Sequence, residues 1–212
     1  MATSAGQLFG DLTVNGVITC SSLVGATNRT QMTQELSAVH AIPLESWRVW
    51  DDYKTLLGTA ASDDLGISTN GYSTLGTAVP HIRGLDLING TVTGYARTQV
   101  QLPYNYVSGG AVAVRFCTGM VTGVAATSAT IDLEAYRSLR TRLVASDIVS
   151  TSAITSVNST TFSEQSFSLT ATDLVPGSWL DLRVMLSVVN TAVAANTYLA
   201  FLHSELLCTV QG

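Results

Sequence analysis

Lysine is almost absent from this 212-residue sequence, since Lys54 is the only one, and charged residues make up 12% of the chain. Helix surfaces are usually built from Lys, Glu, Gln and Arg, so this scarcity argues against helix as the main element. The formal net charge of −5 argues against a sequence-independent grip on nucleic acid, which needs a basic track along the phosphates. We therefore expect no direct nucleic-acid partner.

Cysteine is also scarce: Cys20, Cys117 and Cys208 lie far apart, with no paired spacing that would hold zinc. We interpret them as buried small apolar residues in a reducing compartment. No run approaches the roughly 20 apolar residues of a membrane span, and the first residues lack the basic and apolar pattern of a signal peptide. The sequence thus predicts no membrane partner and assembly in a cytoplasm.

Catalytic and metal-binding motifs are missing as well. His40, His81 and His203 are isolated, without the HxH or HExxH spacing of a metal site, and no GxSxG elbow or phosphate loop is present. We interpret His203, within an apolar segment, as a hydrogen-bonded core or interface residue. The pairs Asp51-Asp52 and Asp63-Asp64 are typical of turns. The sequence predicts no catalytic residues, no metal and no cofactor, and so a protein that is not an enzyme.

What the chain does have is 46% apolar residues, many Ser and Thr, and 17 glycines. Apolar and polar residues alternate in several segments separated by turn residues, as they do in antiparallel strands with one wet face. This pattern predicts an all-β fold, an antiparallel β-sandwich with a jelly roll as the expected form. Residues 132–142 also fit a helical face, although we favour a strand up to Tyr136. The strand segments are 95–102, 112–116, 129–136, 167–169, 180–188 and 197–210.

The first 45 residues differ from the rest and predict an extended N-terminal arm. The Asn15-Gly16 pair within an alternating stretch favours a hairpin turn, and a lone hairpin is marginal in water, so it should pair with another surface. Met32, Leu36 and Val39 recur at helical spacing, which predicts a short helix or linker before Pro43. We expect an arm over residues 1–45 and a β-sandwich domain over residues 46–212.

Two parts of the chain resemble bacteriophage structural proteins. The stretch Gly-Asp-Leu-Thr-Val-Asn-Gly-Val-Ile-Thr at 10–19 resembles strand-and-turn units near the N-termini of tail-fibre and decoration proteins. Segments 42–51, 60–66, 131–137 and 176–183 are similar to a family of mostly uncharacterised virion components. The resemblance implies a capsid cement or decoration protein that binds and stabilises the outside of a phage head, often as a homotrimer. It further implies the major capsid protein as partner and location at the virion surface.

Residue assignments follow from this resemblance and from apolarity. For the contact between the arm and the capsid we expect Leu8, Phe9, Leu12, Val14, Val17 and Ile18. For the contact between copies of the chain we expect Trp47, Val49, Trp50, Leu199, Phe201 and Leu207.

Three alternatives remain open at this stage. The first is a tail-fibre or receptor-binding protein whose sandwich loops bind a host glycan, which exposed Tyr72, Tyr104 and Tyr106 around a groove would favour. The second is a jelly-roll glycan hydrolase, which needs two carboxylates about 5–10 Å apart in a cleft. The third is the major shell subunit, which the short chain and the lack of an obvious long helix disfavour.

Overall fold

A computed structural model describes residues 35–69, 78–121, 126–139, 142–191 and 197–212. Among them, no helix is long and apolar enough to cross a membrane. A short 3-10 turn, η1, covers Leu44–Ser46, and strands make up the rest of the regular structure. The strands are β1 (Glu35–Ile42), β2 (Gly66–Ser68), β3 (His81–Arg83), β4 (Gly90–Gln101), β5 (Val112–Met120), β6 (Ser128–Leu139), β7 (Arg142–Asp147), β8 (Ser163–Leu169), β9 (Trp179–Asn190) and β10 (Leu199–Gln211).

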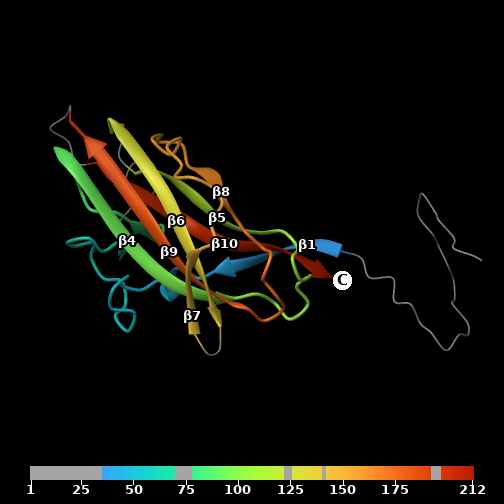
Figure 1. Cartoon of the computed structure of the whole chain (residues 1–212). Coiled ribbons are helices and arrows are strands. Elements are labelled where there is room, and N and C mark those ends of the chain that lie inside the picture. The colour runs from blue at the N-terminus through green and yellow to red at the C-terminus, as the bar shows by residue number, and fades with distance from the viewer. Residues whose placement is uncertain (1–34, 70–77, 122–125, 140–141, 192–196) are drawn as a thin grey trace, which may run out of the picture. The chain divides into compact units, whose positions relative to one another are not determined.

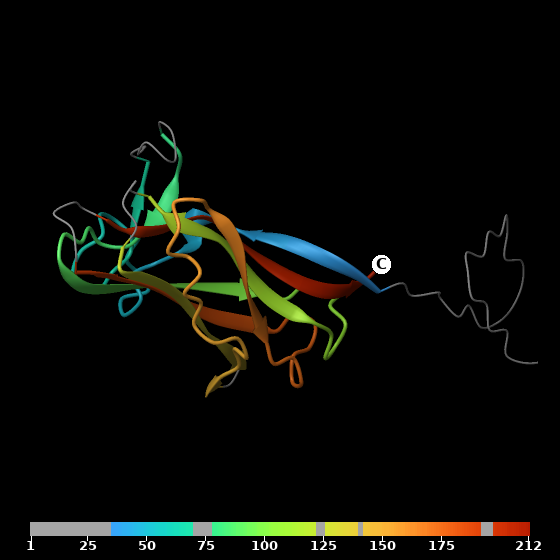
Figure 2. The same ribbon diagram turned by 90° about the horizontal axis from the view of Figure 1, so that it is seen from above.

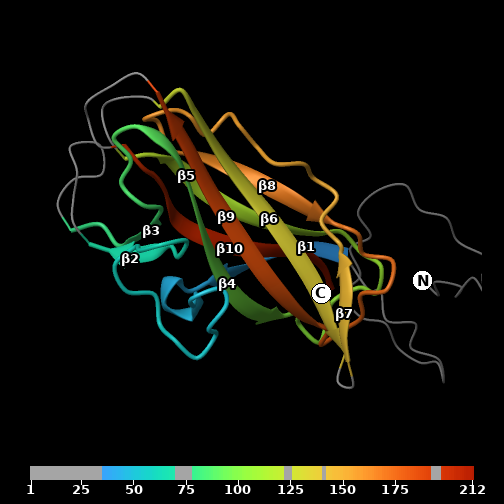
Figure 3. The same ribbon diagram turned by 60° about the vertical axis from the view of Figure 1, so that its left-hand side comes forward.

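The strands form two antiparallel sheets packed face to face (Figure 1). One sheet has the order β2-β3-β10-β5-β8, with β1 added against β10, and the other has the order β4-β9-β6-β7. If β1 and β2 are left aside, the two sheet orders are β3-β10-β5-β8 and β4-β9-β6-β7. In each order, strands from early in the chain lie beside strands from late in the chain, as in a jelly roll. The predicted antiparallel β-sandwich is confirmed, and Figure 3 shows β4, β9 and β6 in front of the β10 sheet.

The core lies between the sheets because each long strand alternates in burial. The inward residues of β9 are Leu180, Leu182, Val184, Leu186 and Val188, and all are buried. From the other sheet, Phe116, Phe167 and Phe201 pack edge to face with ring centroids 5.2 to 6.0 Å apart. Such contacts add specific geometry to the free energy gained by removing apolar surface from water.

The helical interpretation of residues 30–42 is wrong for the part that the structure describes. Residues 35–42 form β1, whose eight residues pair with β10 from Ser204 to Gln211. Figure 2 shows β1 in blue beside the C-terminal strand. Apolar residues at Leu36, Ala38 and Ile42 also fit a period of two, and the free edge of β10 supplies backbone partners that the isolated sequence does not reveal.

One local expectation agrees with the structure. The segment that also fitted a helix is a strand, β6, whose residues up to Ser138 pair with β9. Val175-Pro176-Gly177-Ser178 forms a turn closed by the Ser178 backbone N–H donating to the Val175 carbonyl. Gly177 has a φ of 74°, a left-handed conformation that suits glycine at the third position of a type II turn after proline. This turn directs the chain into β9 at Trp179.

Trp47 connects the chain after β1 to the core. Its side chain is 1% exposed, packs against Phe116 and Phe201, and donates from Nε1 to the Ser204 hydroxyl at 3.1 Å. Trp47, Leu199 and Phe201, which we expected at the contact between copies, lie inside the core of a single chain, and a contact between copies stays a prediction. Their apolarity reflects the centre of the sandwich, which sequence alone does not separate from an interface.

Replacement of Trp47 by alanine should lower the free energy of unfolding by about 3–5 kcal/mol, because it leaves a cavity among aromatic rings. Urea unfolding followed by circular dichroism measures the change. Trp179→Ala is the matched control, since Trp179 is 46% exposed and surface substitutions usually stay within about 0.5 kcal/mol. Equal losses in the two variants would contradict the placement of Trp47 in the core.

Candidate functional site

The outer face of the β4-β9-β6-β7 sheet carries a regular array of polar and aromatic side chains. Because the strands are in register, residues of one parity lie opposite one another in rows across β4, β9 and β6. We call these side chains the polar face. Its rows are Tyr95, Met185 and Asp132; Arg97, Arg183 and Glu134; Gln99, Asp181 and Tyr136; and Gln101, Trp179 and Ser138.

Asp181 occupies the centre of the polar face and is 1% exposed. Arg97 binds it with a two-pronged ion pair, in which Nε and the terminal nitrogen each lie 2.6 Å from a carboxylate oxygen. Gln99 adds a longer hydrogen bond of 3.4 Å. The bonds to Asp181 raise the pKa of Arg97 above its ordinary value. A buried carboxylate held in this way is rigid and fully compensated.

Glu134 forms the second charged group of the polar face. Its Oε1 accepts from Arg183, on the neighbouring strand, and its Oε2 accepts from the Tyr136 hydroxyl at 2.6 Å. Burial raises the pKa of Glu134, but the hydrogen bonds from Arg183 and Tyr136 outweigh it and leave the pKa below its ordinary value. Each carboxylate oxygen of Glu134 therefore accepts a hydrogen bond, which fixes the orientation of the side chain on the face.

An aromatic cluster closes one edge of the polar face. Trp50, from the segment after η1, packs on Tyr95 of β4 with ring centroids 5.3 Å apart, and its Nε1 donates to Asp63. The Arg183 guanidinium lies 5.3 Å from the Trp50 ring centre and 5.4 Å from that of Tyr95. Cation–π attraction to these two rings therefore helps to hold Arg183, which also pairs with Glu134.

A shallow cleft of about 70 Å³ opens beside this cluster. At roughly 30 Å³ for each water in the liquid, the cleft has room for about two waters or one small polar substituent of a ligand. Nε of Arg183 is buried and has no hydrogen-bond partner among the described residues. Burial raises the pKa of Asp132, with a smaller contribution from the charge of Glu134. The lining residues are Tyr95, Asp132, Leu133, Glu134, Arg183 and Met185.

Trp179 lies at the other end of the polar face, directly after the Pro176-Gly177 turn, and is nearly half exposed. It is six residues along β9 from Met185, the neighbour of Tyr95, which corresponds to about 20 Å at about 3.4 Å per residue. The face thus presents aromatic surface at both ends and hydrogen-bonding groups between them. This arrangement suits a ligand that is extended, apolar on its faces and rich in hydroxyl groups.

The residues expected from sequence to make contacts are only partly on this face. Trp50 lies on the polar face, whereas Val49 and Leu207 are half-buried in other parts of the structure. Tyr104 is 77% exposed, but Tyr106 is buried and donates to the Gly110 carbonyl, so Tyr106 does not offer the exposed ring that the glycan alternative expected. The arm residues Leu8, Phe9, Leu12, Val14, Val17 and Ile18, together with Tyr72, lie outside the described residues.

Sequence reasoning missed Arg97, Glu134, Asp181 and Arg183 as candidate site residues. The available signal was their parity, since each falls on the alternate positions of β4, β6 or β9 that were expected to face water. Parity marks a face as wet, but only the cross-strand register brings these residues together.

Comparisons with known proteins give little guidance. No model of a known protein family matches the sequence, and no curated protein matches it either. Among solved structures, TmCBM61 in complex with beta-1,4-galactotriose has 12% identity and a TM-score of 0.45, over 78% of this chain and 90% of that one. A structure of carbohydrate-binding modules from the β-sandwich superfamily has 9% identity and a TM-score of 0.34, over 81% and 55%. Similarity this low does not indicate what the present chain binds.

The hydrogen bond to Glu134 raises the pKa of Tyr136 from 10.0 to about 12. Because the folded value lies above the ordinary one, this bond stabilises the fold fully below pH 10.0 and the contribution is lost as the pH rises through about 12. The difference in phenolate absorbance between the native protein and Tyr136→Phe should therefore titrate near 12. In a Glu134→Gln background the same difference should move toward the ordinary value. A native midpoint near 10 would show that the bond is absent.

Proposed function

We propose that this protein binds a neutral saccharide chain on the polar face of its four-stranded sheet. The observation that carries the proposal is the combination of aromatic surface at both ends of the face with a fixed array of planar polar groups between them. Sugar rings present apolar C–H faces, which pack on aromatic rings, and a rim of hydroxyl groups, which exchange hydrogen bonds with carboxylate, amide and guanidinium groups. The polar face offers both aromatic rings and hydrogen-bonding groups on the same side of the paired strands β4, β9 and β6.

The geometry of the face favours binding over catalysis. Asp132 and Glu134 line the same cleft, but each oxygen of Glu134 already accepts a hydrogen bond within the face. Asp181, the other carboxylate near the centre, is almost completely buried under Arg97. Side chains tied to one another in this way lose little further freedom when a ligand binds, which lowers the entropic cost of association.

The charges of the face favour a neutral ligand. Arg97 is paired with Asp181 and Arg183 with Glu134, so both cations are compensated within the face. Asp132 accepts a backbone bond from Leu133 but has no ion-pair partner among the described residues. The surplus charge of this part of the structure is therefore negative, and a carboxylated or sulfated sugar would be repelled from the cleft.

A second candidate function is the capsid decoration inferred from the sequence, which remains a proposal. One observation favours it: β1 pairs with β10 on one side only, and its other edge has no strand partner among the described residues. An open edge of eight residues with exposed Leu36 and Val39 is suited to accept a strand from another protein. Chain residues 1–34 lead directly into this strand.

Saccharide binding is tested with neutral and acidic oligosaccharides on an array, followed by calorimetry with the neutral sugars that bind. Trp179→Ala should weaken the binding about tenfold or more, since truncation of an aromatic side chain that packs on the ligand typically costs more than 1.4 kcal/mol. Val39→Ala, an exposed apolar change on the opposite sheet, should leave the affinity unchanged.

Asp132→Asn tests the charge argument separately, because it removes the unpaired carboxylate and should let acidic sugars bind that the native protein rejects. The proposal is overturned if no neutral oligosaccharide binds, or if Trp179→Ala and Val39→Ala behave alike. Preference of the native protein for acidic sugars would contradict the charge argument alone.

The decoration function is tested by light scattering and by co-sedimentation with phage particles stripped of accessory proteins. We expect a trimer mass and saturable binding that Val39→Lys weakens by placing a charge beside the open β1 edge. A monomer that does not bind particles, while still binding saccharide, would leave only the first function.

A further inference from the structure

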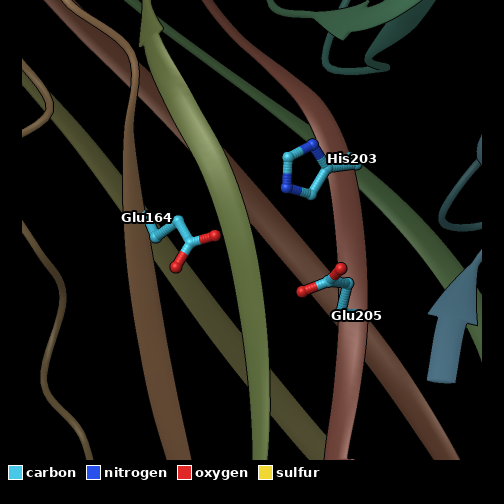
Figure 4. Close-up of side chains that lie close together, drawn as sticks. All are labelled: Glu164, His203 and Glu205. Carbon is cyan, nitrogen blue, oxygen red and sulfur yellow. The ribbon is translucent and has the colours of Figure 1, made fainter. Parts of the chain in front are cut away.

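We infer that Glu164, His203 and Glu205 form a binding site for a divalent transition-metal ion, with Zn²⁺ as the best-fitting ion, on the outer face of the β10-β5-β8 sheet. The three residues come from two strands, β8 and β10, that flank β5. Their ligand atoms all lie within 4.8 Å of one another. Figure 4 shows the two carboxylates and the imidazole ring pointing toward one another over β5.

Strand register brings these side chains together on one face. His203 lies opposite Cys117 on β5, and Cys117 lies opposite Glu164 on β8. His203, Cys117 and Glu164 therefore form one row across the sheet. Glu205 follows His203 by two residues on the same face and lies opposite Arg115. Neighbouring strands are about 4.8 Å apart, so His203 and Glu164 are about 10 Å apart at the backbone, a span that a histidine and a glutamate close together.

Arg115 positions the two carboxylates without occupying them fully. It lies 3.0 Å from Oε2 of Glu164 and 2.6 Å from Oε2 of Glu205. Oε1 of each glutamate has no hydrogen-bond partner among the described residues and remains available as a ligand. Hydrogen bonds to one oxygen of a coordinating carboxylate are a regular feature of the second shell around protein-bound metals.

His203 supplies the nitrogen that distinguishes this group from an ordinary acidic patch. Its side chain is exposed and makes no hydrogen bond with any of the described residues, so the core part of our expectation for His203 is wrong, and the interface part stays a prediction. A neutral imidazole with two carboxylates is a ligand set for zinc, which binds nitrogen at about 2.0–2.1 Å and carboxylate oxygen at about 2.0–2.2 Å, with the fourth position taken by water. Small rotations of the two flexible glutamates bring the oxygens to such distances.

The thiol between these residues is not part of the set. The thiol of Cys117, which lies between His203 and Glu164 in the same row, is not in the group whose ligand atoms lie within 4.8 Å of one another. With Arg115 included, the formal charge of the two glutamates and the arginine is −1, so a divalent cation is attracted. Calcium and magnesium prefer sites made entirely of oxygen ligands, which His203 does not complete.

Calorimetry of the full chain, free of any affinity tag, with Zn²⁺ should show one ion bound per protein. His203→Ala and Glu164→Gln should each weaken the binding about tenfold or more. Both residues are exposed, so neither variant should lose its fold, and circular dichroism checks this. His40→Ala is the matched control, because His40 is an exposed histidine on β1 that lies outside the group.

Three outcomes would overturn the inference: no Zn²⁺ binding at millimolar concentration, equal binding by the native protein and His203→Ala, or loss of binding in His40→Ala. A Cys117→Ser variant that loses all binding would show a thiol-based site and would also overturn this ligand set. Amide signals of β5 and β10 that broaden with Co²⁺ in the native protein, and persist in His203→Ala, would place the ion at the inferred site.

Discussion

Asp181 carries a negative charge almost completely removed from water, and the arrangement of the four-stranded sheet depends on Arg97 to compensate it. An unpaired charge at such a position would cost several kcal/mol, and removal of one partner from a buried pair typically costs about 3–5 kcal/mol. The two residues are diagonal neighbours on β4 and β9 rather than direct ones. Their bond therefore exists only in one register of the two strands.

The same register creates a conflict that the face must resolve. Arg97 lies directly opposite Arg183, and like charges in that position repel. Each arginine instead turns to a carboxylate, Arg97 to Asp181 and Arg183 to Glu134, so that charges alternate across the sheet. A slip by one residue would send these groups into the core and bring leucines and valines to the surface. The polar face and the apolar core thus specify the same pairing from opposite sides of the sheet.

The fold was predictable because its main signal is local. Alternation in residues 180–188, repeated in the segments that became β4, β5 and β6, is enough to predict strands with one buried face. The assignment failed at β1, where the spacing of Leu36 and Val39 fits a helix and the spacing of Leu36, Ala38 and Ile42 fits a strand. There the outcome depends on β10, about 170 residues later in the chain, and no local pattern contains that information.

The candidate sites were beyond the reach of sequence because they depend on which strands become neighbours. Glu164 and His203 are 39 positions apart and share a row only because both flank β5. Trp50 reaches the polar face because Trp47, three residues earlier, is fixed in the core, and because Arg48 pairs through its backbone with Arg97. One buried ring therefore positions a half-buried ring on the polar face. Strands that present side chains already bonded to one another hold those side chains in one arrangement, which is costly to change.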